Sequence, residues 1–215
     1  MAEKLTLLGT WRSPFSGRVK LALKLKKVEY EYIEEDLTNK SDLLLQSNPI
    51  YKKIPTIVHG GKSMCESLII VEYIDEVFDG YPFFSKDPCE RAHARLISKF
   101  IDDKCIPAIW QVVRGKGDDR EKAKVEVSQH LQVLEKELEG KVFFGGDNIG
   151  IVDITANFIA FWLPIFQEVI GVFVVNPNDF PLLCKWSDAF VAHDICKMAL
   201  PDRDKVYASA KAHFG

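Results

Sequence analysis

The spacing of apolar positions predicts alternating strands and helices in the first third of the chain. Residues 4–9 form a short apolar run, which is typical of a strand, and residues 29–33 form a second run rich in tyrosine and isoleucine. Between them, apolar residues recur at i, i+4, i+7 and i+8, the spacing of a helix with one buried face: Phe15, Val19, Ala22 and Leu23. This order predicts a right-handed parallel crossover.

The same pattern continues to residue 78. Residues 36–46 are polar and then leucine-rich, which indicates a loop and a short helix. Residues 56–59 and 62–65 flank Gly60-Gly61, and this predicts a two-residue β-hairpin. A helix is expected to begin at Ser67, with these apolar residues at helical spacing: Leu68, Val71, Ile74, Val77 and Phe78. The resulting order, β-α-β-α-β-β-α, is that of a small α/β domain.

The pattern changes after a turn-rich segment, and only helices are expected beyond it. Residues 89–114 read as helical, with Pro107 expected to kink or break the helix. Further helices are expected at residues 118–139, 151–169, 181–191 and 202–212. The 118–139 helix has an apolar stripe formed by Val127, Leu131, Leu134 and Leu138. We therefore expect an α/β domain over residues 1–79, a linker over 80–88 and an all-α domain over 89–215.

Composition and charge argue against two classes of binding partner, nucleic acids and membranes. The chain has 215 residues and a net charge of −3, and its acidic and basic residues are interspersed. This pattern gives no support for binding to nucleic acid or to a membrane surface. Residues 158–175 are apolar enough to raise the question of a membrane span, but Pro164, Gln167-Glu168 and Gly171 disfavour one.

The cysteines favour a reducing, cytoplasmic location. Their number is five, and no two are spaced as Cys-x-x-Cys, so neither a disulfide framework nor a metal site is indicated. The apolar run Leu5 to Leu8 is too short for the core of a signal peptide.

Two predicted helix starts carry a serine. Ser13 is a plausible N-cap and Pro14 follows at the first helical position, while Ser67 opens the later helix. Free backbone N–H groups at such a start can hold a carboxylate. Pro55, just before the hairpin, makes Ile54-Pro55 a candidate cis peptide bond. Taken alone, these residues are better explained as ordinary caps and turns.

Several short motifs, in one order and spacing, carry a family resemblance that covers nearly the whole chain. They are Ser13-Pro14-Phe15-Ser16-Gly17-Arg18-Val19, residues 34–41, residues 48–55, Cys65-Glu66-Ser67, and Phe143-Phe144-Gly145-Gly146-Asp147 with Val152-Asp153-Ile154. The N-terminal part resembles the thioredoxin fold. With the helical domain appended, the chain resembles the glutathione transferases, and most closely the plant tau class. Gly150 stands where many members of the family have the serine or threonine of a capping box ahead of Asp153.

The resemblance implies a glutathione site, position by position. Ser13 matches the serine whose hydroxyl bonds the glutathione sulfur. Glu66 and Ser67 match the pair that binds the γ-glutamyl ammonium and carboxylate. Ile54 matches the residue whose backbone pairs with the cysteinyl group. Lys40 and Lys53 match the lysines at the glycyl carboxylate, and their charges complement those of glutathione.

A second, apolar pocket is expected between the domains. By resemblance its candidate walls are Phe15, Ile106, Trp110 and Trp162, although plain core packing would explain the same residues. The role of Arg18 stays open, because spacing alone only puts it about one turn from Phe15.

The implied function is conjugation of glutathione, as co-substrate, to hydrophobic electrophiles in detoxification and stress response, by a homodimer. Side activity toward organic hydroperoxides is a further expectation. The alternatives are a non-catalytic carrier of apolar ligands or glutathione conjugates, an interaction module of this fold, and a thiol transferase. The last is disfavoured because neither position 13 nor position 16 is a cysteine.

Overall fold

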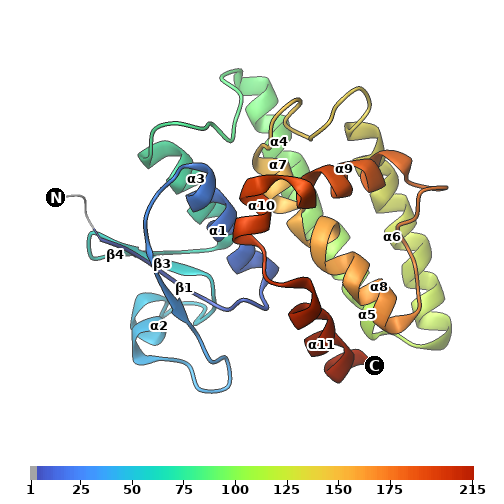
Figure 1. Cartoon of the computed structure of the whole chain (residues 1–215), viewed down its shortest axis with the longest axis horizontal. Helices are drawn as coiled ribbons and strands as arrows, with labels where there is room; N and C mark the ends of the chain where they lie inside the picture. The colour runs from blue at the N-terminus through green and yellow to red at the C-terminus, as the bar shows by residue number, and fades with distance from the viewer. Residues whose placement is uncertain (1–3) are drawn as a thin grey trace. The chain divides into compact units, whose positions relative to one another are not determined.

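A computed structural model describes residues 4–215 of the chain. The chain divides into two compact units (Figure 1). The first runs to Pro82 and includes Met198–Leu200, and the second comprises Phe83–Lys197 and Pro201–Gly215. The first contains a sheet with helices and the second contains helices, so the expected fold class is confirmed.

The first unit is built on a four-stranded sheet with the order β2-β1-β3-β4. Its strands are β1 (Leu5–Gly9), β2 (Glu31–Glu34), β3 (Thr56–His59) and β4 (Lys62–Cys65). β1 is buried along its whole length, as expected of a central strand. It pairs parallel with β2 and antiparallel with β3. Gly60 and Gly61 both have positive φ, of 55° and 76°, which a two-residue hairpin turn requires.

Helices α1 (Pro14–Leu25) and α3 (Ser67–Val77) pack against each other, and Figure 1 shows α2 (Asp42–Ser47) across the strands from them. The predicted buried face of α1 is confirmed at Val19, Ala22 and Leu23. The prediction for α3 was partly wrong: Val77 is 47% exposed, and Ile70 completes the buried stripe with Val71 and Ile74. Ile70 lies four residues before Ile74, so it is the true neighbour on that face.

The second unit is helical, and a π-helical turn lies within each of two helices expected there, just ahead of Pro107 and of Pro164. Its elements are α4 (Pro88–Phe100), η1 (Ile101–Cys105), α5 (Ile106–Arg114), α6 (Gly117–Glu137), α7 (Ile151–Thr155), η2 (Phe158–Trp162), α8 (Leu163–Ile170), α9 (Pro181–Ala192) and α11 (Arg203–Phe214). The sequence pattern gave no sign of α10 (Asp194–Ala199), a helix of six residues that is too short to show a clear period.

The single buried helix expected at residues 151–169 is wrong, because the structure has α7, a π-helical turn η2 and α8 in its place. Pro164 has no N–H to donate to the carbonyl of Ala160 four residues earlier. The Ser187 hydroxyl donates to that carbonyl instead, at 2.8 Å. A side chain of α9 therefore satisfies the acceptor that the proline leaves without its helical partner.

Asp153 organises the start of α7. Its buried carboxylate accepts hydrogen bonds from the backbone N–H groups of Gly150, Phe144 and Gly145 at 2.8–3.0 Å, and from the Trp186 indole at 2.7 Å. Burial raises the pKa of Asp153 to about 6, although these four donors favour its charged form. Glycine suits position 150, since an added Cβ would lie 3.2 Å from the Gly145 Cα and 3.3 Å from the Phe83 carbonyl oxygen.

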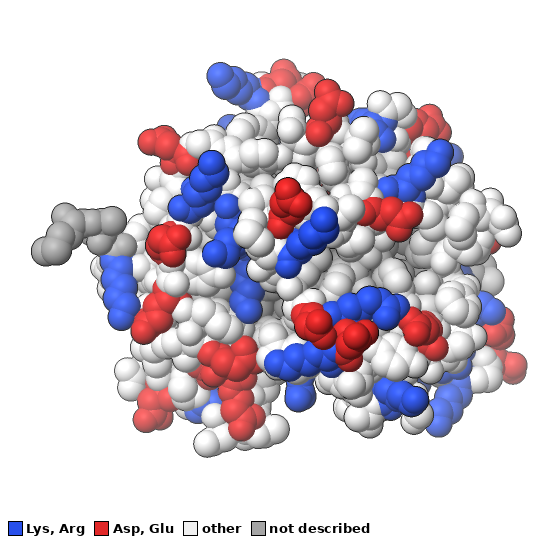
Figure 2. Space-filling model, in the orientation of Figure 1, with Lys and Arg blue, Asp and Glu red and all other residues white. Residues whose placement is uncertain are grey.

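The surface carries charges of both signs. On the face shown in Figure 2, acidic and basic side chains are interspersed. All five cysteines fall within the described residues and are free. Within residues 4–215, no helix is both long enough and apolar enough to cross a membrane.

We expect Asp153→Ala to lower the free energy of unfolding by about 3 kcal/mol or more, because it leaves four donors, two of them in buried hydrogen bonds, without their acceptor. Urea unfolding followed by circular dichroism measures the change. Asp147→Ala, an exposed aspartate in the preceding loop, is the matched control and should stay within about 0.5 kcal/mol of the parent. Equal stability of the two variants would contradict the role given to Asp153.

Candidate functional site

Ser13 caps the N-terminus of α1, as the sequence predicts. Its Oγ accepts the backbone N–H of Ser16 at 3.2 Å, and its own N–H donates to the Thr10 carbonyl at 3.1 Å. Because the hydroxyl oxygen serves as an acceptor for the helix, its proton can be donated to a group outside the helix. The side chain is half-buried and lies at the positive end of a 12-residue helix. This geometry suits stabilisation of an anion.

Glu66 and Ser67 mark the N-terminus of α3. Ser67 is the first residue of the helix and is buried, whereas the Glu66 side chain is exposed. Glu66 has φ 70° and ψ 113°, a conformation that favours glycine and costs a residue with a side chain roughly 1–3 kcal/mol. Strained residues of this kind cluster at ligand sites, where the surrounding structure holds them. The carboxylate of Glu66 therefore stands beside a helix start in a fixed backbone geometry.

Arg18 connects these two helix starts. It is fully buried on α1, and its Nη1 donates to the Ser67 Oγ at 3.1 Å. Its guanidinium also lies 4.9 Å from the centre of the Phe15 ring. The sequence left the role of Arg18 open, since its contact with Ser67 spans 49 positions and no local pattern reveals it. One buried cation thus joins the first turn of α1 to the first residue of α3.

Lys40 and Lys53 lie on neighbouring segments. The Lys40 Nζ donates to the Lys52 carbonyl at 2.9 Å, which brings the loop before α2 next to residues 52–53. The Asn48 amide donates to the Lys53 carbonyl at 2.9 Å and so fixes the backbone there, while the Lys53 side chain is exposed. Two ammonium groups from separate segments are therefore available on this side of the first unit.

Ile54 offers its backbone. The peptide bond between Ile54 and Pro55 is cis, the isomer for which the sequence made it a candidate. In the part of the chain that the structure describes, neither the N–H nor the C=O of Ile54 has a hydrogen-bond partner. An extended peptide could pair with both groups, as an added strand does.

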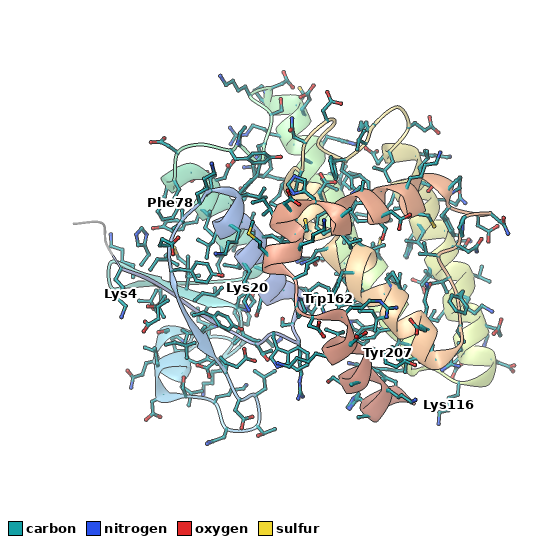
Figure 3. All side chains as sticks on the ribbon, viewed as in Figure 1. Lys4, Lys20, Phe78, Lys116, Trp162 and Tyr207 are labelled. Atoms are coloured by element: carbon teal, nitrogen blue, oxygen red, sulfur yellow. The ribbon has the colours of Figure 1, made fainter. Side chains whose placement is uncertain are left out.

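The four predicted apolar residues differ in accessibility. Phe15 and Trp110 are half-buried, whereas Ile106 and Trp162 are 4% and 1% exposed. Trp110 packs on three rings of the second unit, those of Phe158, Phe166 and Phe214, with centroids 5.3–6.1 Å apart. Among residues 4–215, the buried indole N–H of Trp162, labelled in Figure 3, has no hydrogen-bond partner. Each π-helical turn immediately precedes or includes one of these positions, a placement frequent at functional sites.

Comparison with known proteins places this geometry in a family. The model for the glutathione S-transferase N-terminal domain matches residues 3–76, and that for the C-terminal domain matches residues 89–194. Glutathione transferase GST 23 of Zea mays is 50% identical over 214 residues, covering 99% of this chain and 96% of the relative. Glutathione S-transferase U8 of Arabidopsis thaliana is 47% identical over 215 residues, covering 99% and 96%.

Solved structures agree with the sequence relatives. The tau class glutathione S-transferase MiGSTU from mango, Mangifera indica, superimposes with a TM-score of 0.91 at 38% identity, covering 97% of this chain and 98% of the other. Rice GST1 (OsGSTU1), solved in complex with glutathione, gives a TM-score of 0.88 at 34% identity, covering 100% and 99%. The chain belongs to the glutathione S-transferase family, and its relatives confirm the tau-class resemblance.

Proposed function

We propose that the protein transfers the thiolate of glutathione to hydrophobic electrophiles, with Ser13 as the catalytic residue. The hydroxyl of Ser13 at the mouth of α1 carries the proposal, because it engages the helix as an acceptor and keeps its proton for the sulfur. A hydroxyl cannot form the mixed disulfide of a thiol transferase. The family relatives, which are named glutathione transferases, support the same reaction.

The increase in reactivity that comes from ionising the glutathione thiol can be estimated from ordinary pKa values. A free thiol with pKa about 8.5 is only ~3% thiolate near neutrality. A hydrogen bond to the anion is worth roughly 1.5–3 kcal/mol, which is one to two pKa units. Two units give ~25-fold more thiolate, but the weaker nucleophile leaves a net gain of roughly 3-fold. Holding the electrophile beside the sulfur must supply most of the acceleration.

The conjugation reaction needs no oxidant or reductant. The thiol proton passes to solvent, the sulfur forms a bond to the electrophilic carbon, and an aryl halide releases its halide. The same thiolate would attack the O–O bond of an organic hydroperoxide. This yields an alcohol and a sulfenic acid, which a second glutathione converts to the disulfide and water.

Three parts of the first unit are expected to contact the rest of the glutathione molecule. Glu66 faces the γ-glutamyl ammonium, and Ser67, held by Arg18, faces its carboxylate at the start of α3. The backbone N–H and C=O of Ile54 form hydrogen bonds with the cysteinyl residue of glutathione. Lys40 and Lys53 face the glycyl carboxylate. Opposite charges thus meet at each end of the peptide.

In the second unit, the half-buried ring of Trp110 offers an accessible aromatic surface to an apolar electrophile, and Phe15 in the first unit stays a prediction of the family resemblance. Ile106 and Trp162 are so deeply buried that they act mainly by shaping the packing around Trp110. A carrier of apolar ligands would use the same surfaces, but it would not require the Ser13 hydroxyl.

We also infer a homodimer in the cytoplasm. The inference rests on the family resemblance, and Ile69 on α3 is a large apolar side chain, 61% exposed, that is available for such a contact. The five free cysteines suit a reducing compartment.

We expect Ser13→Ala to lower kcat/KM for an aryl halide by about 10-fold or more, because it removes both the hydrogen bond to the thiolate and the contact that holds the sulfur in place beside the electrophile. Glutathione should still bind, as titration calorimetry would show, since the groups at both ends of the peptide remain. Ser13→Thr keeps a hydroxyl and should retain more of the activity. Turnover of Ser13→Ala at the parent level would refute the assignment.

We expect Ser67→Ala to weaken glutathione binding by about 10-fold, because it removes a hydroxyl from the carboxylate and deletes the hydrogen bond that Arg18 donates to that hydroxyl. Calorimetric titration measures the dissociation constant. Ser63→Ala, at an exposed serine on β4, is the matched control. Equal affinities for the two variants would remove Ser67 from the binding site.

We expect light scattering to give twice the 24.4 kDa mass of one chain. Ile69→Glu should shift the protein toward the monomer, because it places a charge in an apolar contact. Val125→Glu is the control, at a valine on α6 that is 60% exposed. A parent protein that is monomeric at every concentration tested contradicts the proposal.

A further inference from the structure

Glu34, the last residue of β2, accepts hydrogen bonds from the loop that leads to Ser13. One carboxylate oxygen accepts the Thr10 hydroxyl at 2.6 Å and the Trp11 backbone N–H at 3.1 Å. The other accepts the Trp11 N–H at 3.3 Å and the Tyr32 hydroxyl at 2.8 Å. The side chain is exposed at the edge of the sheet, yet three groups donate to it. Two of these groups belong to the loop between β1 and α1.

Thr10, in this loop, links Glu34 to Ser13 through hydrogen bonds. Its carbonyl accepts the Ser13 N–H at 3.1 Å, and its own N–H donates to the Ser16 Oγ at 3.4 Å. Thr10 is therefore bonded to Glu34 on one side and to the first turn of α1 on the other. Before it, Gly9 lies opposite Glu34 in the sheet, where an added Cβ would come within 2.7 Å of the Ser16 Oγ. The backbone around Ser13 has little freedom while these bonds persist.

The surroundings keep Glu34 charged. Partial burial opposes ionisation, but hydrogen bonds from Thr10, Tyr32 and Trp11, with attraction to Lys20, hold the pKa of Glu34 below its ordinary value. Lys20, labelled in Figure 3, lies on α1 with its Nζ 3.6 Å from the centre of the Tyr32 ring. Bonds to a charged acceptor are stronger than bonds to a neutral one.

We propose that Glu34 is a positioning residue for the reaction: by binding Thr10 and Trp11 it holds the loop that aims the Ser13 hydroxyl at the glutathione sulfur. This inference rests on the proposed function of Ser13. A misplacement of the hydroxyl by a fraction of an ångström weakens its bond to the thiolate, whereas the groups that bind the ends of glutathione lie on other elements.

The chain supplies a matched control on the same strand. Glu31 also sits on β2, accepts a threonine hydroxyl from β1 (Thr6, 3.1 Å) and pairs with a lysine (Lys4, 3.0 Å, labelled in Figure 3). It makes no bond to the loop before Ser13 among the contacts of the described residues. Glu31→Ala therefore removes a comparable strand contact without releasing that loop.

The test compares Glu34→Ala with Glu31→Ala in steady-state conjugation of an aryl halide across pH. We expect Glu34→Ala to lower kcat/KM by about 10-fold and to raise the apparent pKa of the thiol in the pH profile by about one unit. Its dissociation constant for glutathione should stay within about 2-fold of the parent, because the ends of the peptide remain bound. Glu31→Ala should leave all three quantities near the parent.

A double variant separates positioning from a general loss of structure. If Glu34 acts through Ser13, Glu34→Ala should cost less than about 2-fold in kcat/KM once Ser13 is already alanine. An equal cost in both backgrounds overturns the proposal. Thr10→Val and Thr10→Ser repeat the test should Glu34→Ala fail to fold: valine should reproduce the loss and serine should restore activity.

The outcomes also separate this proposal from the one on which it rests. Parent-level turnover in Ser13→Ala defeats the assignment of Ser13 itself. A loss in Ser13→Ala, with an unchanged rate and pH profile in folded Glu34→Ala and Thr10→Val, leaves the function standing and overturns only the role of Glu34.

Discussion

The rest of the site depends on the capping of α1 by Ser13. A helix start needs acceptors for its free N–H groups, and a serine can meet that need with its oxygen alone. The oxygen is thus fixed in place by the fold while the proton stays available for chemistry. Capping and the proposed catalytic role are compatible because they use different parts of one hydroxyl group. Pro14 strengthens the arrangement, since its missing N–H makes no demand on the cap.

Local patterns in the sequence predict the elements that local forces determine. The cap at Ser13, the hairpin at Gly60-Gly61 and the buried stripe of α6 all follow from residues a few positions apart. The contact of Arg18 with Ser67 could not be predicted in this way, because it joins distant positions on two helices. The family resemblance supplied the names of the site residues, and the structure supplied the geometry that connects some of them.

The interrupted helices show why apolar periodicity was insufficient in the second unit. A run that is apolar on all sides fits one long helix equally well as several short ones. Pro164 removes one backbone donor from this run, and a distant hydroxyl, that of Ser187, takes its place at the Ala160 carbonyl. The wrong assignment of Val77 to the buried face of α3 has a similar explanation: whether Val77 or Ile70 faces inward depends on what α3 packs against, which its own sequence does not specify.

The backbone of Glu66 has a consequence for how the protein tolerates change. A glycine at this position would relieve the left-handed conformation and favour the folded chain, but it would delete the carboxylate next to Ser67. Stability and charge are therefore opposed at this position: glycine would favour the folded chain, whereas the glutamate keeps a negative charge at the start of α3.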